Sequence, residues 1–132
     1  MSTLNVSNIS DGSTSVGTSY VVNGSAKAWL DWAAQPATVV DDSLNVSSLT
    51  DNATGSFDVN YTNNFNSANY STSGNQAFNT DITTYIYMVQ PRNSGTVLAG
   101  SCGVYTKYVS SGGGSGISDY YYNSMTAHGD LA

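Results

Sequence analysis

The sequence predicts an all-β protein, an antiparallel β-sandwich of the jelly-roll-like kind, and three observations lead to this fold class. Ser, Thr, Asn and Gly fill 62 of the 132 positions, and Glu is absent. Helices usually carry Glu, Lys, Ala and Leu on their solvent faces, so this composition is poorly suited to long helices. Ten Tyr residues, together with many Thr and Val, suit a pleated and half-buried surface. Short alternating segments, separated by turn residues about every 8–12 positions, are typical of a sandwich or barrel.

The first 19 residues form a segment of their own in this interpretation. Residues 1–19 are polar and low in complexity, with a turn signal at Asp11-Gly12. We expect them to make a short hairpin or an arm that docks on a neighbouring molecule. The β-sandwich domain is then expected to cover residues 20–132, after an apolar run over residues 20–22 and a turn at Asn23-Gly24.

Residues 26–32 are predicted as a strand. Small and apolar side chains alternate with Lys, Trp and Asp from Ala26 to Trp32, as in a strand with one buried face. A short helix over residues 26–34 is the alternative, because Ala, Leu and Lys are good helix formers.

The clearest supersecondary pattern is a hairpin in the middle of the chain. After a short strand over 38–40 and a turn at 41–43, residues 43–49 and 56–62 both alternate apolar with polar side chains. The connection contains Gly55, which supplies the unusual backbone angle that such loops need. Beyond this hairpin, residues 63–80 are expected to be loop, apart from a strand over 68–72.

Two later segments carry aromatic or apolar side chains on both faces. Residues 82–89 and 103–110 are predicted as strands, and the first is expected to be central in its sheet or buried between sheets or subunits. A Gly-rich loop over 111–116 separates them from a last strand or pair over 117–127.

The two-faced strands lead us to expect a homo-oligomer, most simply a homotrimer. One sandwich cannot cover both faces of every strand, and the surface has few charges to solvate them. The expected contact residues are the large aromatic ones on these strands and on 26–32: Trp29, Trp32, Tyr85 and Tyr87.

Part of the chain resembles a known phage domain. The similar segments are Asn23-Gly24-Ser25-Ala26-Lys27-Ala28-Trp29, residues 43–55 (SLNVSSLTDNATG) and Phe57-Asp58-Val59-Asn60-Tyr61-Thr62. With Ala68-Asn69-Tyr70 and the closing Gly-Asp-Leu-Ala, they resemble a β domain that is widespread in tail-fibre-like and other virion proteins of marine and cyanobacterial phages. The resemblance covers about residues 20–72 and the last five residues. It implies a virion structural role, often contact with the host surface and often a trimer, and it supplies no catalytic residues.

The expected function is therefore that of a bacteriophage virion protein, a fibre or fibre tip that assembles and attaches to host-surface glycans. The alternative is a capsid or tail decoration protein, or cement protein, that binds no receptor. Because Met1-Ser2-Thr3-Leu4-Asn5 has neither a basic start nor an apolar core, we expect synthesis in the host cytoplasm without export and a final location on the virion. The expected partners are further copies of the chain, other virion proteins and a glycan.

The charge pattern argues against two other partner classes. Nine Asp residues outweigh Lys27, Arg92 and Lys107, giving a net charge of −6. Binding to nucleic acid or to an anionic membrane needs clustered basic residues, so we expect neither partner. The single Cys102 permits no disulfide within the chain, and we expect it to be a small buried residue.

We expect no enzyme, no cofactor and no metal site. Asp41, Asp42 and Asp119 are the best candidates for paired carboxylates, but adjacent Asp residues point in different directions and no Glu is present to act as a raised-pKa acid. His128 and Asp130 suggest a metal shared by three copies on a trimer axis, against which stands an ordinary solvated C-terminus.

The best candidate for ligand contact is the run Tyr120, Tyr121 and Tyr122 beside the Gly-rich loop. Tyrosine rings stack on sugar rings and add a hydroxyl group with little conformational freedom to lose. The competing interpretation is that alternate tyrosines pack into the core or into a subunit interface.

Overall fold

The computed structural model describes residues 5–77 and 85–132, and strands dominate it. Three elements precede the main body: β1 (Asn8–Ser10), β2 (Ser15–Gly17) and helix α1 (Thr18–Gly24). The body contains β3 (Ala28–Ala33), β4 (Val39–Leu44), β5 (Val46–Ala53), β6 (Ser56–Tyr61), β7 (Ser71–Ala77), β8 (Tyr85–Pro91), the 3₁₀ turn η1 (Ser94–Thr96), β9 (Val97–Leu98), β10 (Ser101–Ser110), β11 (Ser115–Ile117) and β12 (Tyr122–His128).

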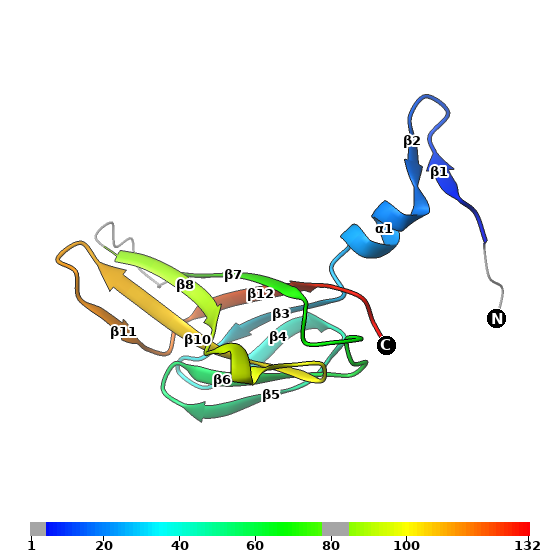
Figure 1. The fold of residues 1–132 in the computed structure, drawn as a ribbon. Coiled ribbons are helices and arrows are strands. Elements are labelled where there is room, and N and C mark those ends of the chain that lie inside the picture. The colour runs from blue at the N-terminus through cyan, green and yellow to red at the C-terminus, as the bar shows by residue number, and fades with distance from the viewer. Residues whose placement is uncertain (1–4, 78–84) are drawn as a thin grey trace.

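Two antiparallel sheets pack together as a sandwich, which confirms the predicted fold class (Figure 1). One sheet has the strand order β4-β3-β12-β7. In the other, β10 is the centre: β6 and β11 pair along one edge, and β8 and β9 pair along the opposite edge. Strand β5 extends this sheet beyond β6.

The alternation predicted for residues 26–32 is present in β3. Ala28, Leu30 and Trp32 are buried, and the residues between them are half-buried on the outer face. Period-two burial is the property of a strand, so the helical alternative is wrong. Strand β3 pairs with β4 on one side and with β12 on the other.

The predicted hairpin is also confirmed. Strands β5 and β6 pair through the Thr54-Gly55 turn, where Gly55 has a φ of 66° that a glycine adopts without strain. The turn expected at 41–43 is wrong, because these residues belong to β4. The chain bends instead at Asn45, with a φ of 57°, and there it passes from one sheet into the other. The Asn45 carboxamide oxygen accepts a hydrogen bond from the Asn63 backbone N–H at 2.8 Å and holds this bend.

Strand β8 differs from the central strand that the sequence predicts over 82–89. Residues 82–84 lie outside the described residues, and the described part pairs along one edge only, with β10. It also packs against β7 of the opposite sheet. Val89 is buried there, whereas Ile86 is 66% exposed on the outer face. The sequence pattern shows apolar residues on both faces of this strand. It does not tell whether the outer face is covered by another layer or exposed to solvent.

Strand β7 is longer than the strand expected at 68–72, and it lies in a region predicted as loop. Its inner face carries Thr72, Gly74 and Gln76 in place of large apolar side chains. At Gly74 the two sheets come close: a Cβ atom there would lie 2.7 Å from the Cβ atom of Val89 and 2.6 Å from the Ser124 carbonyl oxygen.

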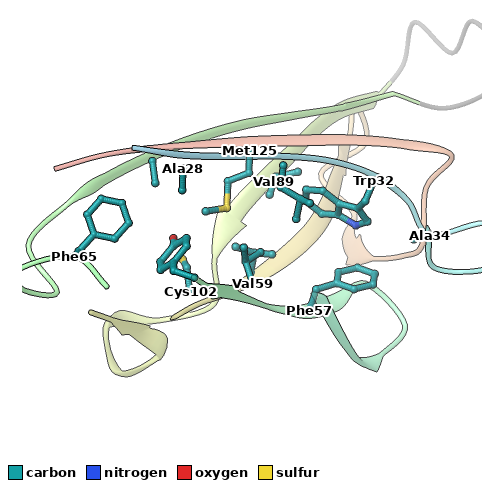
Figure 2. Close-up of a cluster of buried hydrophobic side chains, with 13 residues drawn as sticks. Ala28, Trp32, Ala34, Phe57, Val59, Phe65, Val89, Cys102 and Met125 are labelled. Carbon is teal, nitrogen blue, oxygen red and sulfur yellow. The ribbon is translucent and has the colours of Figure 1, made fainter. Parts of the chain in front are cut away.

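The core lies between the two sheets (Figure 2). Trp32 from one sheet meets Phe57 from the other edge-to-face, with ring centroids 5.9 Å apart. Cys102 is fully buried, as expected, and burial raises the pKa of its thiol to about 11. The buried apolar cluster comprises Ala28, Leu30, Trp32, Ala34, Phe57, Val59, Tyr61, Phe65, Val89, Cys102, Val104, Met125 and Ala127.

The N-terminal elements project away from the sandwich (Figure 1). Strands β1 and β2 form a small hairpin whose turn is held by Asp11, as the sequence suggests; residues 1–4 of the predicted arm lie outside the described residues. The turn expected at residues 23 and 24 is the end of α1, which occupies Thr18–Gly24.

Candidate functional site

Tyrosines from three separate strands and one connection gather at one end of the sandwich. Tyr87 lies 5.3 Å from Tyr120 and 6.0 Å from Tyr85, and Tyr85 lies 5.6 Å from Tyr108, measured between ring centroids. Tyr121 and Tyr122 follow in the chain. We call the six residues the tyrosine end: Tyr85, Tyr87, Tyr108, Tyr120, Tyr121 and Tyr122.

The three consecutive tyrosines proposed as a ligand platform do not share one environment. Tyr120 is 3% exposed and packs against Tyr87, so its ring belongs to the interior. Tyr121 is 40% exposed and Tyr122 is 52% exposed. The chain bends at residue 121, so regular alternation begins only with β12, where Tyr122 faces outward and Asn123 inward. The surface available to a ligand is therefore that of Tyr121 and Tyr122.

The segment just before these two residues is fixed by hydrogen bonds to the sheet that contains β5, β6 and β10. The Asp119 carboxylate accepts from the Gly55 N–H at 2.7 Å, in the turn between β5 and β6. The Thr106 hydroxyl donates to the Ser118 carbonyl at 2.5 Å. Asp119 therefore stabilises the fold at this turn. From the sequence it was only a candidate for a catalytic carboxylate.

Tyr120 is held through its backbone as well as its ring. Its carbonyl oxygen accepts from the Ala34 N–H at 2.8 Å and from the Asn123 side-chain amide at 3.1 Å. The same amide of Asn123 donates to the Trp32 carbonyl at 3.1 Å, and Asn123 is fully buried. These bonds fix the backbone on both sides of Tyr121, so the exposed tyrosines stand on a rigid base.

A hydrogen bond between the two sheets supports the same end. The Gln76 side-chain amide, on the inner face of β7, donates to the Lys107 carbonyl of β10 at 2.8 Å. Sequence reasoning missed Gln76, Asn123 and Tyr108 as parts of this site. For Tyr108 alone the sequence offered an indication: it lies two residues after Thr106 in the same strand, so the two side chains point to the same, inner face.

Two tyrosines of this end, Tyr87 and Tyr120, have raised pKa values. Burial, with smaller contributions from neighbouring tyrosines, raises the pKa of Tyr120 to about 12. Burial and the proximity of Tyr85 also raise the pKa of Tyr87. The rings of Tyr87 and Tyr120 are therefore uncharged phenols, which stack but supply no acid or base near pH 7.

The acidic residues weighed for catalysis are not brought together. Asp41 and Asp42 lie on β4, whereas Asp119 lies in the connection between β11 and β12 and holds the Gly55 turn of the other sheet. Asp42 does face Asp31 across the strand pair, on the outer face of the four-stranded sheet. Like charges placed opposite each other are mildly destabilising.

His128 and Asp130 lie at the C-terminal end. His128 closes β12 opposite Ser71, and the Asp130 carbonyl accepts from the Asn66 N–H at 2.7 Å. In residues 5–77 and 85–132, no three His, Cys, Asp or Glu side chains are grouped to hold a metal ion.

The four residues expected at a subunit interface are dispersed. Trp32 is completely buried in its own core, so it presents no surface to a second copy, and this assignment is corrected. Trp29 is half-buried on the outer face of β3, between Leu44 and Thr126. Tyr85 and Tyr87 belong to the tyrosine end.

None of the helical segments that the structure describes has the length and apolar character needed to span a bilayer. Comparison of the chain with protein-family models, with curated proteins and with solved structures gives no match.

Proposed function

We propose that this chain is a structural protein of a bacteriophage virion, of the fibre or fibre-tip type, and not an enzyme. It assembles as a homotrimer, contacts other virion proteins and attaches to glycans on the host surface through Tyr121 and Tyr122. The resemblance of residues 20–72 to phage tail-fibre-like domains supports the class of protein. The placement of the arm and the exposed tyrosines supports separate sites for assembly and for attachment.

The observation that carries the proposal is that the two ends of the sandwich differ. The arm formed by β1, β2 and α1 leaves one end of the sandwich, and the ends of β8, β10 and β12 that bear the tyrosines lie at the opposite end (Figure 1). A protein that assembles through an element at one end and meets a surface with the other needs this arrangement.

The chemistry of the exposed tyrosines fits a sugar. A pyranose ring offers an apolar face of C–H groups and a rim of hydroxyl groups, and a tyrosine offers an aromatic face and one hydroxyl. Because the bonds around Asp119 and Asn123 already fix the backbone beneath Tyr121, binding loses little further entropy there.

The test begins with a glycan array that includes host lipopolysaccharide, followed by solution titration of a monovalent sugar that scores on the array. Replacing both Tyr121 and Tyr122 by Ser is expected to weaken sugar binding about tenfold or more, because two stacking faces are lost. Tyr20→Ser is the matched control, since Tyr20 is 76% exposed but lies on the arm. Its affinity for the monovalent sugar should equal that of the unmodified chain.

Two outcomes would overturn attachment through these tyrosines: no glycan or lipopolysaccharide retained by the unmodified protein, or equal binding by the double variant. If binding is absent while the protein is abundant in purified virions, and particles lacking it are fragile, the decoration or cement role is favoured.

A further inference from the structure

The arm, defined as residues 5–24, lacks the means to hold its own shape. Its two strands have three residues each, and α1 has seven residues and no side-chain hydrogen bond at its N-terminal cap. A two-stranded ribbon or a helix of this length is marginal in water without a surface to pack on. Figure 1 shows the arm projecting away from the sandwich of its own chain.

The arm also exposes apolar side chains. Ile9 and Val16 are directly paired across the hairpin and are 47% and 40% exposed. Six such residues lie within this short segment: Val6, Ile9, Val16, Tyr20, Val21 and Val22. Apolar surface concentrated in one element marks an interaction site.

The arm carries a single charge. The Asp11 carboxylate, at the tip of the hairpin, accepts from the backbone N–H groups of Ser13 and Thr14 at 2.9 and 2.7 Å. These bonds lower the pKa of Asp11 and keep it ionised. The arm therefore presents apolar residues around one fixed negative charge.

A surface with the opposite charge lies on the sandwich. On the outer face of β8, β10 and β11, Lys107 stands in one row with Met88 and Ile117, and Val109 stands beside Ile86 in the next row. Ile86 and Ile117 are 66% and 43% exposed. We call this surface the β8–β10–β11 face: Ile86, Met88, Tyr105, Lys107, Val109 and Ile117.

Lys107 differs from the other two basic residues of the chain. The Lys27 ammonium donates to the Val22 carbonyl and to the Ser25 hydroxyl, and Arg92 pairs with Asp58. Over the part of the chain that the structure describes, no carboxylate forms an ion pair with Lys107. In a protein of net charge −6, an apolar face that surrounds such a cation suits an apolar partner with one negative charge.

We propose that the arm of one copy packs on the β8–β10–β11 face of a neighbouring copy, with Asp11 paired to Lys107. The inference rests on the self-assembly part of the proposed function and is independent of sugar binding. The contact joins two different surfaces, so it is heterologous, and a ring of three copies closes it without leaving an arm or a face uncovered.

The first experiment uses the complete chain and measures association constants by analytical ultracentrifugation at low salt. Asp11→Lys and Lys107→Asp should each weaken association on the order of fivefold, and combining them should restore it. Replacing Ile86 and Ile117 together by Ser should weaken association at least tenfold. Val39→Ser is the matched control, because Val39 is 53% exposed on the other sheet, and it should leave association unchanged.

The second experiment identifies the contact directly. A carbodiimide condenses the Asp11 carboxyl with the Lys107 amine to an amide, with loss of water, when the two groups touch. In an equal mixture of ¹⁵N-labelled and unlabelled protein, the cross-linked peptide should include mixed-isotope pairs, which only two different copies can produce.

Assembly without a mixed-isotope Asp11–Lys107 peptide, or charge reversals that the combined variant does not rescue, would overturn the arm contact and leave the proposed attachment untouched. A protein that remains at 13.8 kDa at all concentrations would overturn both the contact and the homotrimer. The monovalent sugar titration would still test attachment in that case.

Discussion

At the scale of single residues, polar side chains with buried hydrogen bonds position the candidate site. Asn123 bridges two carbonyl groups, and Asp119 holds the turn at Gly55. Neither residue has a sequence signature, because Asn and Asp abound in this chain. The same limit applies to Tyr120–Tyr122, where three identical residues give no indication of which one points inward.

Asn123→Ala should lower the free energy of unfolding by about 2–4 kcal/mol. The substitution removes the donor from two buried carbonyl groups and leaves both without this partner. Urea unfolding followed by tryptophan fluorescence measures the loss. Ser124→Ala, one residue further and half-buried on the outer face, is the control, and an equal effect of both variants would contradict the role given to Asn123.

At the scale of elements, strands were predictable wherever burial alternates. Strands β3 and β6 place buried apolar residues at every second position, and the sequence located both, whereas β10 was located from apolar and aromatic residues on both of its faces. Strand β7 was missed beyond residue 72 because its inner face is made of Thr, Gly and Gln, which carry no hydrophobic period. Helix α1 was not predicted, because none of its seven residues has a high helix propensity.

Gly74→Ala should destabilise the sandwich by about 1–3 kcal/mol through overpacking. The added methyl group would meet a backbone carbonyl and the Cβ atom of Val89, and neither can move away without separating β7 from its neighbours. Chemical denaturation measures the change. Gly112→Ala serves as control, since a Cβ there meets nothing within 4 Å, and comparable losses in both variants would refute this account.

At the scale of the whole molecule, burial of weak acids makes folding sensitive to alkali. Burial raises the pKa of Cys102 to about 11 and those of Tyr70 and Tyr120 to about 12, above the ordinary values of 9.0 and 10.0. In this pH range the unfolded chain releases protons that the folded chain retains. The stability contributed by these groups is thus complete below about pH 9 and is lost as the pH rises towards 12.

The expected loss is about 1–3 kcal/mol for each group across that window. Denaturant titrations between pH 8 and pH 12 measure it, and Tyr120→Phe should reduce the slope because one raised pKa is removed. A free energy of unfolding that stays constant from pH 9 to pH 12, or that rises, would show that these groups ionise equally easily in both states.

The route of the chain through β3 has a mechanical consequence. A pull on the arm enters the sandwich at β3, and this strand is bonded on both sides, to β4 and to β12. The hydrogen bonds of both ladders run across the direction of pull, so force loads them together in shear instead of opening them one at a time. A load that reaches the sandwich through the arm would thus be shared by two ladders of hydrogen bonds at once.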